Sequence, residues 1–424
     1  MKIIINKILF VFTSLLIALL AFEIILRILG FSVSAYQNYA NNKKLNKASQ
    51  CRIMCLGESM TAGQYPLQLQ RILDKKYPGK FAVIDCGIRG TVLEVIYMLL
   101  DMNIEKYNPD IVICMMGNNN GFFMNQDYIN KINLDNSRSR IKLYKLYLLL
   151  IKGHIDNLKD LYFNKKTLNA DSKNERAYYK ITDTYRKYKI FNKIVYERAL
   201  KALDMNFRFH KIDYYRIVIV NNLIKDNYKK AVFFINKLLD DNEVIEPLSD
   251  YYSLIEINSM VRQFLTEEQK TKMLDKISSI KTDRSLGSVA VDYIRQKKFS
   301  KAEEFFDMTD ELRMNFPNQE TNRMYRLIVK KLIDNDIKVI CMQYPVRDVK
   351  ILQNIFKDED YYDKITFVSN EDNFKKVLKT RGYDSVFKDQ VSGDIGHCNN
   401  YGNTLIADNA AAALENLMRS RCFK

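Results

Sequence analysis

The chain has 424 residues and a mass of 49.9 kDa, which exceeds one hydrophobic core and predicts two or three folded units. Hydrophobic residues make up 47% and charged residues 27%, which excludes a disordered chain. The 14 Gly and 6 Pro exclude a collagen-like protein and argue against an all-β fold, because tight turns need both residues. The net charge of +16 favours acidic partners such as anionic lipid, anionic glycan or nucleic acid.

The amino terminus contains a long apolar segment. Residues 8–22 carry no charge, and extension to Leu29 makes the segment long enough to cross a bilayer, which needs about 20 mostly apolar residues. A cleaved signal peptide is the alternative, but the small-residue site at 33–35 lies well past the apolar block. We expect residues 1–30 to be an uncleaved single-pass anchor. The lysines that precede it place the rest of the chain outside the cytoplasm.

The sequence after the anchor alternates between strand-like and helix-like segments. Residues 31–50 are polar and without periodicity, which predicts a linker. Strand-like apolar runs follow at 53–56, 81–86, 111–116 and 339–342. Segments with apolar residues at helical spacing are 65–75, 93–106, 325–332, 373–379 and 404–418. The alternation predicts an α/β domain with a parallel sheet between helices, formed by residues 51–125 and 321–424.

Residues 126–320 interrupt this domain and are almost free of strand signals, Gly and Pro. A short polar turn, an aromatic residue and then an alanine recur, with Ala231 and Ala302 71 residues apart and Ala199 in an earlier unit. The pattern resembles the tetratricopeptide helix pair, whose period is about 34 residues. It predicts an all-α insert that recruits a protein partner. A helical insert without repeats is the alternative.

The insert begins with a basic stretch. Residues 138–189 contain 14 Lys and Arg and 5 Asp and Glu, and 138–151 interleave basic residues with Leu and Tyr. A basic amphipathic helix there would lie on an anionic membrane or bind an acidic glycan. The same pattern fits a helix that packs its apolar side on the α/β domain. Basic residues among aromatics are also found in nucleic-acid binders, but the anchor argues against that class, and we expect no nucleic acid.

The seven cysteines cannot all pair with one another, because their number is odd. Cys55, Cys86, Cys114 and Cys341 lie inside the strand-like runs, where a free cysteine behaves as a small hydrophobe. The sequence contains no CxxC pair of the kind that binds zinc. We expect structural thiols with at most one disulfide, and neither a metal nor a cofactor.

Three separate segments carry the residues of a nucleophilic site. Ser59 follows the first predicted strand in a turn that would expose its hydroxyl at the carboxyl end of the sheet, although a serine there can also simply cap a helix. His397 is the one histidine of three that lies in a Gly-flanked loop, and Asp394 lies three residues before it. A serine nucleophile needs such a base, oriented by a carboxylate. Gly90 and Asn119 follow the second and third strands and would supply oxyanion donors.

These residues resemble the motif blocks of the SGNH (GDSL-like) hydrolase family over about residues 50–125 and 325–424. The resemblance implies that Ser59 is the nucleophile and that its backbone N–H is one oxyanion donor. It also implies that Gly90 and Asn119 are the other two donors, that His397 is the general base and that Asp394 is its orienting acid. Three positions depart from the family pattern: Glu58 replaces Asp, Asp85 replaces Asn and Asn120 replaces Asp.

The resemblance further implies a three-layer, flavodoxin-like fold and a serine esterase that hydrolyses or transfers an acyl group. With an anchor and a basic surface, an O-acetylated cell-surface polysaccharide is the leading candidate substrate and a lipid ester is the second. A catalytically silent scaffold, in which the helical insert binds a partner, is the alternative from a different class.

Overall fold

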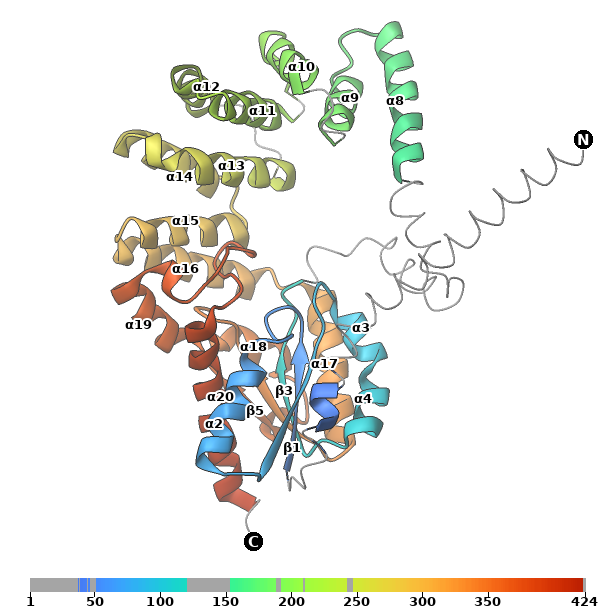
Figure 1. Cartoon of the computed structure of the whole chain (residues 1–424), viewed down its shortest axis with the longest axis vertical. Coiled ribbons are helices and arrows are strands. Elements are labelled where there is room, and N and C mark those ends of the chain that lie inside the picture. The colour runs from blue at the N-terminus through green and yellow to red at the C-terminus, as the bar shows by residue number, and fades with distance from the viewer. Residues whose placement is uncertain are drawn as a thin grey trace, which may run out of the picture. The chain divides into compact units, whose positions relative to one another are not determined.

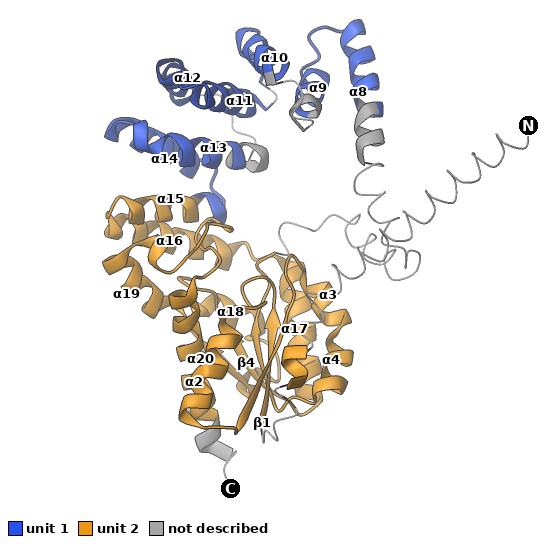
Figure 2. Ribbon diagram, in the orientation of Figure 1, with its two compact units in different colours: residues 1–26, 139–285 blue, residues 27–138, 286–424 orange. Residues whose placement is uncertain are grey.

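A computed structural model describes residues 37, 39–43, 45, 51–119, 153–187, 192–208, 210–241 and 247–421 (Figure 1). The chain divides into two compact units, residues 1–26 with 139–285 and residues 27–138 with 286–424 (Figure 2). The predicted anchor at 1–30 and the basic segment 138–151 lie outside the described residues, whereas part of the predicted linker between 31 and 50 is described. Within the described ranges, no helix is both long enough and apolar enough to span a membrane.

The second unit, called the α/β unit here, contains a sheet of five parallel strands. They are β1 (Cys51–Gly57), β2 (Phe81–Gly87), β3 (Ile111–Met115), β4 (Lys338–Met342) and β5 (Ile365–Val368), in the order β2-β1-β3-β4-β5. This is the strand order of flavodoxin-like sheets, in which ligands bind beyond the carboxyl ends of β1 and β3. Four strands were predicted. The prediction missed β5, which is only four residues long and has Thr366 among its three apolar residues.

Helices cover both faces of this sheet, as predicted (Figure 1). The buried residues of one face form a core with α3 (Leu93–Met98), α4 (Leu100–Tyr107), α17 (Gln319–Asp334) and α18 (Val349–Phe356). The other side carries α2 (Tyr65–Lys76), α19 (Glu371–Arg381) and α20 (Asn400–Arg421). Because β2 and β3 are buried along their whole length, their sequences do not alternate between apolar and polar residues; β3 is entirely apolar, and β2 is apolar except for Asp85.

The six cysteines within the described residues are free thiols. The four that were predicted to lie in strands are buried there, where each contributes to the packing of the sheet as a small apolar group.

Part of the predicted linker belongs to the α/β unit. Residues 37, 39–43 and 45 are helical, and the Asn41 side chain bonds to both backbone groups of Asp85, at 2.9 Å to the carbonyl and 3.1 Å from the N–H. Gln37 Nε2 donates to the carbonyls of Asp85 and Gly87 at 2.8 and 3.1 Å. β2 is an edge strand, so these amide side chains satisfy backbone groups that lack a second strand partner.

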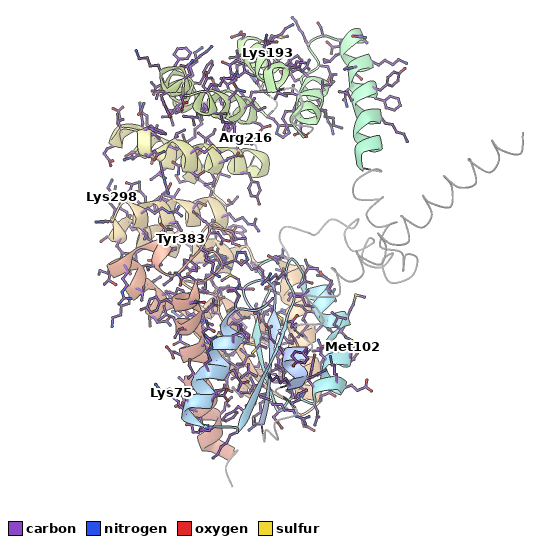
Figure 3. The ribbon with its side chains drawn as sticks, viewed as in Figure 1. Lys75, Met102, Lys193, Arg216, Lys298 and Tyr383 are labelled. Atoms are coloured by element: carbon purple, nitrogen blue, oxygen red, sulfur yellow. The ribbon has the colours of Figure 1, made fainter. Side chains whose placement is uncertain are left out.

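The described part of the first unit, called the helical unit here, is made of helix hairpins. Its helices are α8 (Gly153–Ala170), α9 (Glu175–Lys187), α10 (Asn192–Asp204), α11 (Lys211–Ile224), α12 (Tyr228–Asp240), α13 (Pro247–Val261) and α14 (Glu267–Ser278). α9, α11 and α13 begin at equal intervals along the sequence, and α15 (Asp283–Arg295) begins one interval later. Arg216, which is labelled on α11 in Figure 3, links this helix to α13 by an ion pair of 2.6 Å with Glu256.

The hairpin turns that the sequence predicted to be equivalent have the same geometry. Asp226 and Lys297, two residues before α12 and α16 (Phe299–Asn315), are left-handed with φ of 55° and 60°. In both turns the next N–H bonds back to a carbonyl five residues earlier, at 2.8 Å. Ala231, Ala302 and Ala199 are fully buried, which allows close packing of neighbouring helices.

The helical unit ends at Ser285 and not near residue 320, where the sequence placed the end of the insert. α15 and α16 belong to the α/β unit because they pack on the loop that precedes α20. A Cβ atom on Gly287 would lie 2.8 to 2.9 Å from backbone and side-chain atoms of Asp394. Arg295 Nη1 donates to Gln390 Oε1 at 2.9 Å.

Candidate active site

Ser59 lies in the turn between β1 and α2, at the carboxyl edge of the sheet. The turn packs closely between the ends of neighbouring strands. A Cβ atom on Gly57 would lie 2.3 Å from the Met115 carbonyl oxygen of β3, and one on Gly87 would lie 2.4 Å from the Ala62 nitrogen. Glycine is therefore required on both strands for the backbone of the turn to sit this deep.

His397 joins Ser59 to a carboxylate. The distance from His397 Nε2 to Ser59 Oγ is 2.9 Å, and the distance from His397 Nδ1 to Asp389 Oδ2 is 2.7 Å. The backbone N–H of His397 donates to Asp389 Oδ1 at 2.7 Å. With the ring proton on Nδ1 facing the carboxylate, Nε2 is free to accept the Ser59 hydroxyl proton. The side chains of His397 and Asp389 are 28% and 48% exposed, so the group is open to solvent.

The predicted acid, Asp394, does not contact the His397 ring. Its carboxylate is buried and accepts two bonds of 2.9 Å from Arg347 and one of 2.9 Å from Arg313. Burial opposes ionisation, but the two guanidinium groups outweigh it and hold the pKa of Asp394 well below its usual range. The assignment of Asp394 as the orienting acid is therefore corrected: Asp389 holds the imidazole, and Asp394 forms a buried ion-pair network.

The fold of the loop between Asp389 and His397 explains why Asp389, and not Asp394, contacts the His397 ring. The Val391 N–H donates to the Ile395 carbonyl at 2.9 Å, which folds the loop back on itself. A Cβ atom on Gly396 would lie 1.7 Å from the Asp389 carbonyl oxygen, so the two ends of the loop touch. Gly396, directly before His397, is the sequence feature that this close approach to Asp389 requires. The prediction instead followed the Asp-x-x-His spacing and chose Asp394.

The predicted oxyanion residues lie in adjoining loops. Gly90 is in the exposed loop after β2 with φ of 64°, a conformation that favours glycine. Asn119 follows β3, is buried, and donates from Nδ2 to the Thr91 carbonyl at 3.0 Å. That bond fixes the amide beside the Gly90 loop, and the amino group carries a second N–H for another acceptor.

Asp85, which replaces the family's Asn, holds two of these loops together. One carboxylate oxygen accepts the Gly63 N–H at 2.7 Å, in the turn that follows Ser59. The other accepts the Gly87 N–H at 2.9 Å, at the start of the Gly90 loop. Asp85 therefore ties the turn of Ser59 to the start of the Gly90 loop.

Glu58 is a further residue of the site that sequence reasoning treated only as a motif variation. It is 1% exposed, and its carboxylate accepts the Gly117 N–H at 2.7 Å and the Tyr344 hydroxyl at 2.5 Å. Burial raises the pKa of Glu58, while these donors oppose the shift. The residue connects the turn of Ser59 to the loop that carries Asn119.

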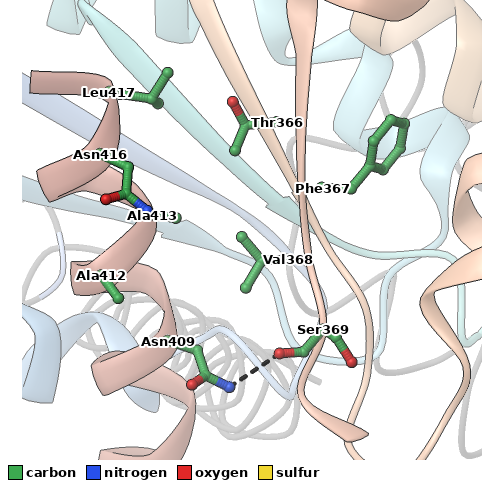
Figure 4. A pocket seen from close by; sticks show the side chains of 9 residues that line it. All are labelled: Thr366, Phe367, Val368, Ser369, Asn409, Ala412, Ala413, Asn416 and Leu417. Carbon is green, nitrogen blue, oxygen red and sulfur yellow. Dashed lines mark hydrogen bonds between the residues drawn. The ribbon is translucent and has the colours of Figure 1, made fainter. Parts of the chain in front are cut away.

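A shallow cavity of about 430 Å³ lies elsewhere in the α/β unit, between β5 and α20 (Figure 4). Its lining residues are Thr366, Phe367, Val368, Ser369, Asn409, Ala412, Ala413, Asn416 and Leu417. None of these side chains is an acid or a base, so the cavity offers no proton-transfer chemistry. The site built around Ser59 is separate from it.

Comparison with known proteins gives no support for a family assignment beyond the motif residues. No protein-family model matches the chain, and the searches of curated proteins and of solved structures found no match either. The resemblance to SGNH hydrolases therefore depends on the motif blocks and on the geometry described above.

Proposed function

We propose that the chain is a serine esterase of the SGNH type. The observation that carries the proposal is the hydrogen-bonded series Ser59, His397 and Asp389 at the carboxyl edge of the sheet. Ser59 follows β1, and Asn119 follows β3, the pair of strands between which flavodoxin-like sheets bind ligands. A serine, a histidine and a carboxylate in this order are the parts of an acyl-transfer site.

The reaction follows from the direction of each hydrogen bond. Ser59 Oγ attacks the ester carbonyl carbon while its proton moves to His397 Nε2, and Asp389 stabilises the resulting imidazolium. The carbonyl oxygen becomes an oxyanion that accepts N–H groups of Ser59, Gly90 and the Asn119 side chain. The C–O bond to the alcohol breaks as His397 returns the proton to the leaving oxygen.

Water or a second hydroxyl then completes the cycle. His397 takes a proton from this acceptor, whose oxygen attacks the acyl carbon, and Ser59 leaves with the proton that His397 returns. Hydrolysis and acyl transfer differ only in the acceptor. The steps use only the side chains and backbone N–H groups of this chain and the acceptor hydroxyl, and we propose no metal or cofactor.

For the substrate we propose an acyl ester, most simply an acetyl ester, on a cell-surface glycan, and a lipid ester as the second choice. The apolar segment at 1–30 supports attachment to a membrane with the catalytic unit on the outer side. The net charge of +16 supports an anionic surface as the working environment.

The test is hydrolysis of p-nitrophenyl acetate by the full chain in detergent, with Ser59→Ala and His397→Ala. Both variants should lose the activity. Ser259→Ala, at an exposed position of the helical unit, should keep it. If the wild type refuses this ester, a fluorophosphonate should still label Ser59. A folded wild type that neither hydrolyses the ester nor takes the label would refute the proposal.

A scaffold is the second candidate function, because the evenly spaced hairpins of the helical unit expose large apolar side chains. Among them are Tyr162, Phe163, Ile224 and Phe233. Repeated hairpins commonly form partner-binding surfaces. Ser59→Ala separates the two candidates: a scaffold keeps its biological role in that variant, whereas an esterase loses it.

A further inference from the structure

The loop after β4, residues 344–347, contacts all three segments that carry the candidate catalytic residues. We infer that Arg347, in this β4 loop, is a positioning residue that sets the oxyanion loop and the histidine loop in register. The inference rests on the proposed esterase function, since it assigns a role in that reaction.

Arg347 connects two loops with one guanidinium group. Its Nε and Nη2 donate to the two oxygens of Asp394 at 2.9 Å each, and Nη2 also donates to Asn118 Oδ1 at 3.0 Å. Asp394 lies in the histidine loop, and Asn118 immediately precedes Asn119. A planar fork with this geometry fixes orientation as well as distance, which a lysine cannot do.

A second contact joins the same two loops. Asn118 Nδ2 donates to Ser392 Oγ at 2.5 Å, two residues before Asp394. Asn118 is therefore held on one side by Arg347 and on the other by the histidine loop itself. A shift of Arg347 would move the amide of Asn118 and with it the neighbouring Asn119.

The β4 loop also reaches the nucleophile turn. Tyr344 donates its hydroxyl to Glu58, the residue before Ser59, at 2.5 Å. Between Tyr344 and Arg347, Val346 is buried with φ of 60°, an unfavourable conformation for a β-branched residue. Such strain persists where surrounding contacts over-determine the backbone, and it is typical of functional sites.

Arg347 acts through other residues and not on the substrate. Its side chain is 10% exposed, and its hydrogen bonds go to Asp394 and Asn118. Arg313 of α16 completes the ion-pair network by donating to Asp394 Oδ2, the same oxygen that accepts from Arg347 Nε, at 2.9 Å. The reacting groups Ser59 and His397 are thus positioned by loops whose spacing Arg347 sets.

The experiment compares Arg347→Met and Arg347→Lys with the wild type in the full chain. Arg347→Met should lower kcat for p-nitrophenyl acetate by about 10²-fold with little change in KM, because small displacements of reacting groups cost about that much. The rate of fluorophosphonate labelling at Ser59 should fall in step. Arg347→Lys keeps the charge but not the fork, and should give an intermediate loss. Arg323→Met, at an exposed arginine paired with Glu320 on its own helix, is the matched control and should behave as the wild type.

If Arg347→Met does not fold, Asn118→Ala decides, because it removes the bridge without exposing a buried charge. It should lower kcat and the labelling rate at an unchanged melting temperature. Folded Arg347→Met or Asn118→Ala with wild-type kcat and labelling overturns the inference and leaves the esterase intact. A folded wild type that shows neither hydrolysis nor labelling overturns the proposed function, and this inference with it.

Discussion

The helical unit depends mostly on contacts between residues close in sequence, whereas the edge of the α/β unit that carries the candidate active site depends on contacts between residues far apart in sequence. In the helical unit, buried positions such as Ala231 pack against hairpins adjacent in sequence, and the helices recur at equal intervals. At the candidate active site, Ser59 Oγ and His397 Nε2 are 2.9 Å apart, although the two residues are 338 positions apart in sequence. A local repeat can therefore be detected from spacing, whereas the site forms only when the strand order brings separate loops to one edge.

The sharpest test of this contrast is the pair of carboxylates in the histidine loop. Asp389→Asn should lower kcat by up to about 10⁴-fold, because one amide oxygen cannot accept both the backbone and the ring N–H of His397. The fold should be unaffected, since Asp389 is half exposed. Kinetics on p-nitrophenyl acetate and urea unfolding of the same preparation measure both effects.

Asp394→Asn should mainly reduce stability and have the smaller effect on kcat, the reverse of Asp389→Asn. It leaves two guanidinium groups buried with one charge partner fewer, and should lower the free energy of unfolding by about 3–5 kcal/mol. Its folded fraction should retain more activity than Asp389→Asn. A larger kinetic loss for Asp394→Asn than for Asp389→Asn would restore the role that the motif spacing assigned to Asp394.

These two residues also mark the limit of sequence-based prediction here. Ser59 and His397 were identified correctly as partners, because a serine after a strand and a histidine in a glycine-flanked loop are local signals. The choice of acid was wrong because it depends on Arg347 and Arg313, which approach from segments far away in sequence. Arg313 lies on α16, a helix that the sequence assigned to the insert.

In the rest of the fold, too, local elements were predicted from the sequence and contacts between distant segments were not. Four strands and most of the helices around them, including α2 and α20, were predicted from periodicity; α18 was not, and the single helix predicted over 93–106 is divided into α3 and α4. The docking of Asn41 on the edge strand was not, because a polar segment without periodicity gives no sign of its partner. Glu58 likewise gave no signal for its contact with Tyr344 on a distant loop.

A smaller effect is expected from Asp310, which lies on α16 beside the same network. Its carboxylate pairs with Arg313 at 3.2 Å and accepts the Asp348 N–H at 3.0 Å, and burial raises the pKa of Asp310 to about 6. The unfolded value is about 3.9, so between about pH 4 and 6 the folded protein binds more protons than the unfolded chain. The free energy of unfolding should therefore fall as pH rises through this window, on the order of 2–3 kcal/mol in total.

The pKa of Asp394 is lowered and acts in the opposite direction: its contribution is present above about pH 4 and lost in more acidic solution. Urea unfolding from pH 3 to 7 should resolve the two slopes. Asp310→Asn should reduce the slope between pH 4 and 6, and Glu58, whose pKa burial also raises, should account for the slope that remains. Asp307→Asn, on the same helix but 73% exposed, should keep it. An unchanged slope in Asp310→Asn would mean that another group titrates.

The smallest effect separates the two units directly. Ala231 and Ala302 occupy the same position after the same turn, one in the helical unit and one in the α/β unit. Valine at either site overpacks a fully buried position and should lower stability by about 1–3 kcal/mol. Only Ala302→Val should also lower kcat for p-nitrophenyl acetate, by a few-fold.

The kinetic difference is expected because Ala302 lies on α16, the helix whose Arg313 holds Asp394 and thereby the histidine loop. Ala231 lies on α12, which contributes no residue to that network. Ala412→Val, at an exposed position of α20, adds the same atoms without overpacking; it should cost only the lower helix propensity of Val, up to about 0.7 kcal/mol, and leave kcat unchanged. Equal kinetic losses in Ala231→Val and Ala302→Val would show that the helical unit, too, controls the geometry of the site. Loss of stability alone in both would show that the hairpin of α15 and α16 supports the histidine loop without setting its position.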